Sequence, residues 1–266
     1  METIELSDYG AQTAFADEAT ALAKKSQNPV ASLISVAFEN NFNFGVGPED
    51  NFQYVLNAKP VVPQELTENW NLIHRVIQPL VAQDNLTKDT GALTDESQFG
   101  LADVTYEAFF TPANTGKLIW GFGPQVTVPW GDDAYTSDKW NAGFASVFLT
   151  MPGRWVIGSL ITQEWDFAGK GSAEDVSRGV IQPFVNYNFD KGWFLTFAPV
   201  WTVNWEAERD SDRWTIPLGG GGGRIFSIGE QKVRLQATGF GYVASPDFID
   251  NDWTLQIDFR LLFPAG

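Results

Sequence analysis

Residues 31–47 read ASLISVAFENNFNFGVG, and apolar and polar side chains alternate along this stretch. One face carries the apolar residues Ile34, Val36, Phe38, Phe42 and Phe44. The other face carries the small or polar residues Ser35, Ala37, Glu39, Asn41 and Asn43. A period of two predicts an amphipathic β-strand. At about 12 to 14 residues, this strand is longer than the five or six residues usual in soluble proteins, and it is long enough to cross a bilayer.

The last part of the chain shows the same alternation. Every second residue from Trp253 to Phe263 is apolar. The positions between them hold Thr254, Gln256, Asp258 and Arg260. A soluble sandwich would turn such an apolar face inward and a membrane barrel would turn it outward, so one strand alone does not distinguish the two folds.

The whole set of strands does distinguish them. Twelve alternating segments follow one another, over residues 32–46, 51–62, 70–81, 99–111, 117–129, 140–151, 155–167, 176–189, 193–205, 213–227, 231–243 and 252–263. Compact connections such as MPGR (151–154) alternate along the chain with mostly longer, acidic ones such as GDDAYTSD (131–138). Short turns at one end and long loops at the other are typical of outer-membrane barrels with both termini in the periplasm. We therefore predict an all-β fold, a transmembrane antiparallel up-and-down barrel of about 12 strands over residues 29–266.

Tryptophans support the membrane barrel. Most of them stand near strand starts (Trp70, Trp140, Trp155, Trp193, Trp214 and Trp253) or strand ends (Trp130, Trp165 and Trp205), with Trp120 and Trp201 nearer to strand interiors. The indole ring is amphipathic and favours headgroup depth, so aromatic girdles at two interfaces would produce this distribution. Packing in an ordinary core is the alternative explanation.

Composition excludes several classes of function. The 266 residues include 17 Lys and Arg against 33 Asp and Glu, a formal charge of −16, which argues against nucleic-acid binding. The chain has no cysteine and one histidine, so disulfide scaffolds, thiolate metal sites and His-rich metal sites are excluded, and we predict no metal and no cofactor. The acidic loops lack the spacing of a recognised Ca²⁺ site, and we expect them to be solvated or to contact the cations that bridge lipopolysaccharide.

The first 28 residues differ from the rest. The start, METIELSDYG, has no positive and apolar regions of a signal peptide, so the protein is either not exported or a mature chain whose signal is replaced by a starting Met. The barrel pattern favours the second. We predict a mobile arm over residues 1–13 and a helix over residues 14–26, because DEATALAKKS (17–26) is rich in helix formers and Pro29 follows. This periplasmic segment, residues 1–28, is either an appendage or a helix inserted in the lumen.

If the apolar parity faces lipid, the other parity lines the lumen. Its charged candidates are Glu39, Lys59, Arg75, Asp103, Glu107, Glu164, Arg178, Arg234, Asp258 and Arg260. Acids and bases are mixed, so these residues either pair and cross-link the walls around a narrow wet passage, or form a constriction that selects the solute. We predict that Arg75 faces the lumen, because an arginine facing lipid would cost roughly 2 to 4 kcal/mol. His74 then faces outward or lies beside a bulge.

The run LGGGGGR contains five glycines, Gly219 to Gly223. It lacks the ending of a phosphate loop and does not open a helix. We predict that this bare wall accommodates an inserted segment, with the N-terminal helix as the candidate.

Several motifs together resemble a known family. They include QNPVASLISVAFENNFNFGVGP (27–48), ENWNLIHRVIQPL (68–80), GKLIWGFGP (116–124), RWTIPLGGG (213–221) and the final FRLLFP (259–264). These stretches resemble the outer-membrane barrel family labelled as proteins of the phenol-degradation meta pathway, also called neuromedin U-like or transporter. The resemblance implies a barrel in a Gram-negative outer membrane that handles small organic molecules, and it offers no catalytic or ligand residues to carry over. The chain departs from outer-membrane habit because Pro-Ala-Gly follows Phe263, so the aromatic insertion signal is not the final residue.

Three functions follow as expectations. The first is a channel or transporter for small organic solutes, aromatic or hydrophobic ones among them. The second is a structural barrel closed by its N-terminus. The third is a membrane-embedded acyl hydrolase, which would need a serine near His74, and no adjacent strand places one at a matching height. We therefore predict that the chain is not an enzyme. Its expected partners are outer-membrane lipid and lipopolysaccharide, a small solute and the barrel-assembly machinery, and no nucleic acid.

Overall fold

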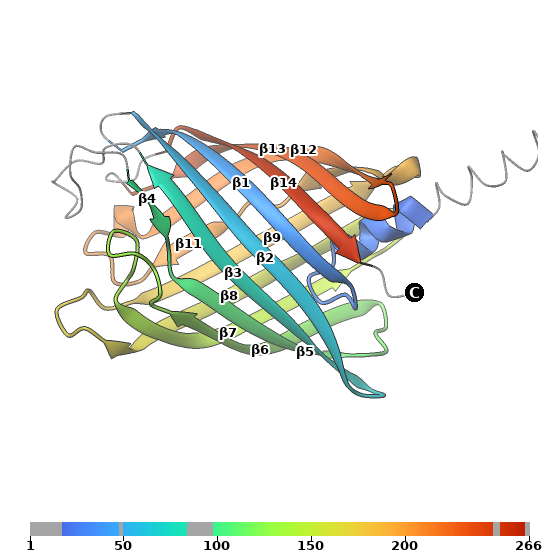
Figure 1. The fold of residues 1–266 in the computed structure, drawn as a ribbon, viewed down its shortest axis with the longest axis horizontal. Helices are drawn as coiled ribbons and strands as arrows, with labels where there is room; N and C mark the ends of the chain where they lie inside the picture. The colour runs from blue at the N-terminus through green and yellow to red at the C-terminus, as the bar shows by residue number, and fades with distance from the viewer. Residues whose placement is uncertain (1–17, 48–49, 84–97, 247–250, 264–266) are drawn as a thin grey trace, which may run out of the picture.

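The protein is a closed antiparallel β-barrel (Figure 1). A computed structural model describes residues 18–47, 50–83, 98–246 and 251–263. Its strands are β1 (Ile34–Val46), β2 (Asn51–Thr67), β3 (Trp70–Gln83), β4 (Gln98–Leu101), β5 (Val104–Pro112), β6 (Leu118–Val128), β7 (Lys139–Thr150), β8 (Trp155–Gly169), β9 (Ser177–Asn188), β10 (Trp193–Phe197), β11 (Trp201–Asn204), β12 (Trp214–Ile228), β13 (Gln231–Ala244) and β14 (Trp253–Phe263). Two 3₁₀ turns, η2 (Asp190–Gly192) and η3 (Asp210–Asp212), and a helix over residues 18–26 complete the secondary structure. No helix in these ranges is long and apolar enough to cross a membrane.

The barrel wall has twelve strands, as the alternation predicts. β4 and β5 both pair with β3 and form one interrupted strand, and β10 and β11 both lie between β9 and β12 and form another. Each remaining strand pairs with its sequence neighbours, and β1 pairs with β14 from Ile34↔Phe263 to Phe44↔Trp253, which closes the barrel.

Three strands differ from their predicted form. The fourth predicted strand, 99–111, is interrupted at 102–103, between β4 and β5. β2 continues to Thr67, five residues beyond its predicted end at 62, so most of the predicted connection is strand. The ninth predicted strand is interrupted at 198–200, where Pro199 has no N–H to give to the wall. There the side chain of Trp201 donates a hydrogen bond to the carbonyl of Pro217 at 3.1 Å, across the break.

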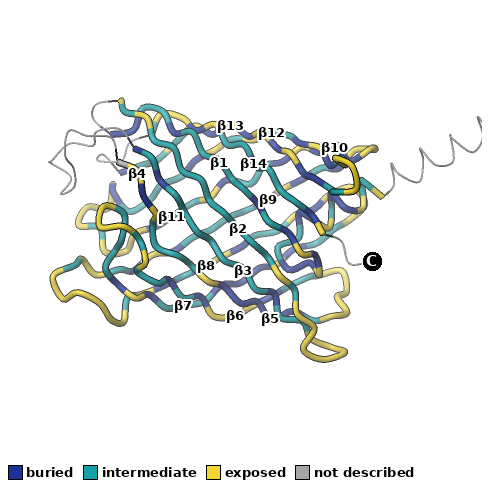
Figure 2. The backbone as a smooth tube through the Cα atoms, in the orientation of Figure 1, coloured by how far each residue is buried: buried dark blue, intermediate teal, exposed yellow. Residues whose placement is uncertain are grey.

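The connections sort by length between the two ends of the barrel (Figure 1). We call the end with the compact connections the turn end, and the other the loop end. The helix and the last described strand residue, Phe263, both lie at the turn end. Figure 2 shows exposed residues concentrated in the connections at both ends.

The predicted faces are confirmed. Along β1, Ser35, Ala37 and Asn43 are buried inside the barrel, whereas Phe38 and Phe44 lie on the outer wall. The tryptophans on the outer wall fall into two groups: Trp70, Trp120, Trp155 and Trp193 near the turn end, and Trp130, Trp140, Trp165, Trp205, Trp214 and Trp253 near the loop end. An apolar outer wall bounded by two tryptophan groups is typical of a transmembrane barrel.

The N-terminal segment covers the turn end of the lumen. Leu22 and Ala23 of the helix are buried in one apolar cluster with Ala31, Leu33, Phe194, Ile225 and Leu262. Farther along, Val30 is buried among inward-facing residues of five strands: Ile73, Phe109, Ala145, Val147, Leu149, Val156, Leu160 and Phe184. The helix is described from residue 18, and the predicted residues 14–17 lie outside the described part. The turn end is therefore packed like a small protein core.

Candidate functional site: the polar chamber in the lumen

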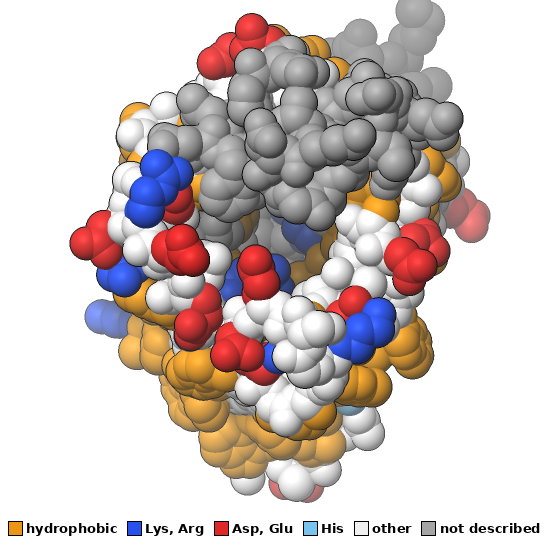
Figure 3. Space-filling model, turned by 90° about the vertical axis from the view of Figure 1, so that its left-hand side faces the viewer, with side chains coloured by type: hydrophobic (Ala, Val, Ile, Leu, Met, Phe, Trp, Pro, Cys, Tyr) orange, Lys and Arg blue, Asp and Glu red, His pale blue; other side chains and the backbone are white. Residues whose placement is uncertain are grey.

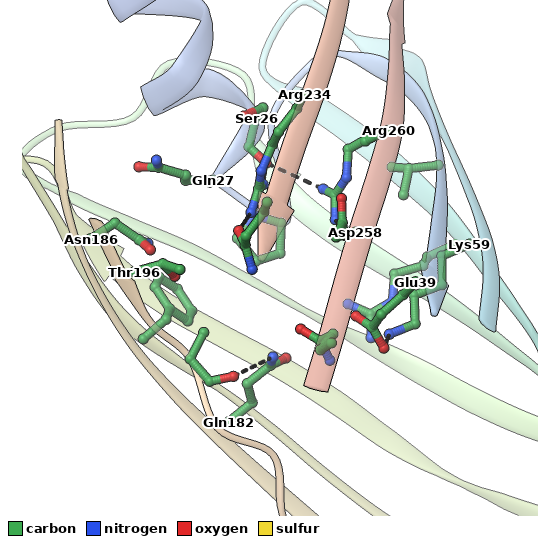
Figure 4. Close-up of a pocket in the computed structure, with 17 residues that line it drawn as sticks. Ser26, Gln27, Glu39, Lys59, Gln182, Asn186, Thr196, Arg234, Asp258 and Arg260 are labelled. Carbon is green, nitrogen blue, oxygen red and sulfur yellow. Dashed lines mark hydrogen bonds and ion pairs between the residues drawn. The ribbon is translucent and has the colours of Figure 1, made fainter. Parts of the chain in front are cut away.

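A cavity of about 140 Å³ lies inside the barrel (Figure 4) and borders the apolar cluster around Val30 at Phe184. We call it the chamber. Strands β1, β2, β13 and β14 supply its charged side, with Glu39, Lys59, Arg234, Asp258 and Arg260. The opposite side is made of the uncharged groups Gln182, Asn186 and Thr196, and Ser26 and Gln27 of the N-terminal segment close it toward the turn end. Period-two alternation explains the polarity, since these residues share the inward parity of their strands.

A row of charges crosses three neighbouring strands. Lys59 Nζ lies 2.7 Å from Glu39 Oε1, and Arg260 lies 3.1 Å from Asp258 Oδ2. The register places Glu39 opposite Asp258, so the two acids lie side by side. Lys59 and Arg260 both align with Ala37, so the two cations lie one inward position nearer the turn end than the acids. Such pairing lets buried charges persist in the wall.

Arg234 extends this row onto β13. The guanidinium donates hydrogen bonds to the carbonyl of Ser26 at 3.2 Å and to the side-chain oxygen of Gln236, and it lies 5.0 Å above the ring of Phe194. Arg260 donates to the same Ser26 carbonyl at 3.3 Å. Two arginines therefore hold the end of the N-terminal helix.

Arg75 faces inward, as predicted, and borders the chamber. Its Nε lies 2.8 Å from Glu107 Oε2, and Glu107 is 2% exposed. The two residues are direct neighbours in the register between β3 and β5. This pair cross-links the wall beside the chamber.

A second polar cluster surrounds Glu164. Its carboxylate accepts hydrogen bonds from Gln125 at 2.8 Å and Thr127 at 2.7 Å, and it forms an ion pair with Arg178. The Arg178 side chain is half exposed. Neither Glu164 nor Arg178 lines the chamber, so they form a separate group in the lumen.

The structure does not bring Asp103 to the chamber. This residue lies in the break between β4 and β5, where its carboxylate accepts hydrogen bonds from the backbone of Gly131 at 3.1 Å and from the backbone and hydroxyl of Ser137 at 2.8 and 2.6 Å. These hydrogen bonds fix the connection between β6 and β7 to the wall. The alternation of residues along the strand could not predict this contact. The loop residues that bind the Asp103 carboxylate lie 28 and 34 positions later in the chain.

Sequence reasoning missed the contribution of Ser26 and Gln27. The side chains of Gln27 and Asn188 exchange two hydrogen bonds of 3.0 Å, and the Ser26 carbonyl accepts from both arginines. The sequence signal was the helix stop at QNP, which frees the last carbonyls of the helix to accept bonds from elsewhere.

His74 lies on the outer wall, on the predicted parity. Its two ring nitrogens lie 2.7 Å from the hydroxyl of Tyr106 and 2.9 Å from the side-chain oxygen of Gln64. Both nitrogens are therefore engaged with partners that are not serine.

The glycine run works differently from the prediction. A Cβ at Gly223 would lie 2.5 Å from the ring of Phe194, so this glycine makes room for an aromatic ring that packs against the helix. At Gly219 and Gly221, a Cβ would lie 1.9 Å from backbone oxygens of Gly239 and Ala237 on β13. The run thus allows close approach of the neighbouring strand, and the helix reaches the wall through Phe194 and Ile225 rather than through bare glycines.

Ion pairs occupy part of the acidic rim at the loop end (Figure 3). Lys170 Nζ lies 2.7 Å from Asp138, and this hydrogen bond raises the pKa of the Lys170 ammonium. Lys139 lies 3.1 Å from Asp166 and 3.0 Å from Asp175. In the part of the chain that the structure describes, no group of three or more His, Cys, Asp or Glu residues is arranged to hold a metal ion.

One solved structure supports the architecture. An outer membrane channel from Pseudomonas putida F1 matches with a TM-score of 0.66, over 87% of this chain and 96% of that chain, at 15% identity. This chain shares that channel's fold. The translocator domain of the autotransporter NalP from Neisseria meningitidis matches at 10% identity over 98% of each chain with a TM-score of 0.47. The CymD monoaromatic hydrocarbon channel matches at 10% identity over 93% of this chain and 91% of that chain, with a TM-score of 0.45. No family model and no curated protein match the sequence.

Proposed function

We propose that the protein is an outer-membrane channel of a Gram-negative bacterium that admits small organic solutes. The observation that supports this most directly is the polar chamber, which lies within a barrel whose outer wall is apolar and bounded by tryptophans. A purely structural barrel has no need of a cavity lined by four cationic side chains. Charged side chains that line a lumen can set the selectivity of a pore.

The chemical class of the solute is part of the same proposal. Motifs along residues 27–264 resemble the barrel family labelled with the phenol-degradation meta pathway. The fold shared with the Pseudomonas putida channel is consistent with that resemblance. Aromatic and hydrophobic molecules are accordingly the first solutes to test.

Solute entry into liposomes tests the proposal. Vesicles containing the purified full chain should swell in isosmotic solutions of small neutral and aromatic solutes, and planar bilayers should show discrete conductance steps. Heat-denatured protein at the same lipid ratio is the control. A barrel that is folded by circular dichroism, yet neither conducts nor admits any solute, would contradict the channel.

The second candidate is a barrel closed by its N-terminus. The contacts at the turn end favour it: Lys24 donates a hydrogen bond to the Gly153 carbonyl at 2.6 Å, and Leu22 and Ala23 are buried. Removing residues 1–28 distinguishes the two. A closed barrel should be silent as the full chain and conduct after the deletion, whereas a channel should conduct in both forms, with a larger step after the deletion.

A hydrolase has less support. Each ring nitrogen of His74 already has a partner, Tyr106 or Gln64. We propose that His74 supports the packing of the outer wall and that the protein is not an enzyme. Ester hydrolysis that disappears in the His74→Ala variant would overturn this. Lipopolysaccharide and the barrel-assembly machinery remain proposed partners.

A further inference from the structure

The charges around the chamber do not balance among the described residues. Three ion pairs, Lys59–Glu39, Arg75–Glu107 and Arg260–Asp258, each join one cation to one acid. Arg234 is the remaining cation of the lining, and no described carboxylate lies within 4.0 Å of it. Counted over the described residues, the chamber therefore carries one excess positive charge, at Arg234.

The neighbours of Arg234 increase this excess locally. The register pairs Arg234 directly with Arg260 across β13 and β14, and like charges opposite each other in a sheet are destabilising. Both guanidinium groups share the carbonyl of Ser26, at 3.2 and 3.3 Å. Arg260 also has its ion pair with Asp258, whereas Arg234 has only uncharged acceptors, and a carbonyl is a dipole that accepts a hydrogen bond without neutralising the guanidinium.

Burial makes the imbalance costly. Arg234 is 7% exposed, and its Nε has no hydrogen-bond partner among the described residues. The Nε of Arg260 likewise has none. A buried charge persists when it is paired, and the nearest described acids, Asp258 and Glu39, already pair with Arg260 and Lys59 and lie beyond 4.0 Å from Arg234.

The cavity next to these arginines has the size of a small organic molecule. Its volume of about 140 Å³ is close to that of a cavity of roughly 150 Å³ that accommodates benzene. Phe184 and Ala198 give its lining an apolar part, and Asn186 and Thr196 face the arginines from the opposite side (Figure 4). A ligand with one anionic group and a compact apolar body would match both parts.

We propose that Arg234, assisted by Arg260, binds the carboxylate of a small organic monoacid of about the size of benzoate. This inference rests on the proposed channel function and names the class of solute that the chamber retains. A carboxylate suits this position because its two oxygens match the parallel N–H groups of a guanidinium. A neutral molecule of the same shape would leave the excess charge uncompensated.

Calorimetric titration of the full chain in detergent micelles tests the proposal without requiring transport. The probes are benzoate and benzamide, which have nearly the same shape and differ in charge. Benzoate should bind to the wild type at least tenfold more tightly than benzamide. The Arg234→Gln variant should lose at least tenfold in benzoate affinity and keep its weak affinity for benzamide.

Arg224→Gln is the matched control. Arg224 is one position from the inward-facing Ile225 on the neighbouring strand β12, but it is exposed on the outer wall, 5.1 Å above the ring of Trp193. Its loss should leave benzoate binding unchanged. An equal loss in both variants, or equal binding of benzoate and benzamide by the wild type, would overturn the proposal. The second comparison needs no variant and therefore decides the matter even if Arg234→Gln does not fold.

Failure of this inference and failure of the channel are distinguishable. A protein that conducts but shows no preference for benzoate overturns the carboxylate site alone. A protein that binds benzoate with the expected dependence on Arg234, yet never admits solute into liposomes, contradicts the channel and leaves the binding site in place.

Discussion

Arg75 and Glu107 form a buried ion pair that joins two neighbouring strands of the barrel wall. Their side chains meet at 2.8 Å between β3 and β5, and Glu107 is almost completely buried. Once one partner of such a pair is lost, the other remains as an uncompensated buried charge, which costs more than the pair contributes. The pair therefore constrains substitution more than it adds stability.

Replacing Arg75 alone should be strongly destabilising. We expect Arg75→Met to lower the free energy of unfolding by about 3 to 5 kcal/mol, because it leaves Glu107 buried and unpaired. Urea unfolding in lipid vesicles would measure this. Arg154→Met is the control, since the pair between Arg154 and Asp190 is exposed and should be worth less than about 1 kcal/mol. Similar losses in the two variants would contradict a special cost of burial.

The pairing partners of these charges could not be predicted from the sequence. Alternation assigns Arg75, Glu107 and Glu164 to the lumen, because parity depends on neighbours along one strand. Which acid meets which base depends on the register between strands, and the register is set by the stagger of the whole barrel. Asp103 illustrates the limit, since a backbone loop and not a guanidinium occupies its carboxylate.

The N-terminal helix and the glycine-rich strand β12 depend on each other through one aromatic ring. Phe194 packs against Leu22 and Ala23 on one side, and on the other it occupies the space above Gly223. Strands could be predicted because their period is local, and all twelve appear within a few residues of their predicted positions. The position of the helix could not be predicted, because it depends on packing against Phe194, a residue of a strand far away in the sequence.

A methyl group at Gly223 should therefore loosen the helix. Its Cβ would lie 2.5 Å from both the Phe194 ring and the Leu235 carbonyl, so the ring and the backbone of β13 must both shift. We expect Gly223→Ala to cost about 1 to 3 kcal/mol and to increase hydrogen exchange in residues 18–26. Gly239→Ala is the matched control, because nothing lies within 4 Å of a Cβ there. Unchanged exchange in the helix of Gly223→Ala would disprove the coupling.

On the scale of the whole molecule, the charge of −16 is unevenly distributed. Acidic residues gather in the loop-end connections, with Asp132, Asp133 and Asp138 in one, Glu174 and Asp175 in the next and Glu206, Glu208, Asp210 and Asp212 in another. Figure 3 shows acidic side chains around this rim. In outer-membrane barrels the long loops face outward and the short turns face the periplasm. Much of the net charge thus lies in the loop-end connections and says little about the solute that the lumen admits.

This orientation can be measured with single cysteines, because the chain has none of its own. Gly171 lies in the loop-end connection after β8, and Gly116 lies in the turn-end connection after β5. A Cβ at either position would meet nothing within 4 Å, so both substitutions should be tolerated. We expect a membrane-impermeant maleimide to label Gly171→Cys in intact cells, and Gly116→Cys only after the outer membrane is broken. The wild type should stay unlabelled throughout. Labelling in the opposite order would reverse the topology, and labelling of both variants in intact cells would contradict a barrel that spans the membrane.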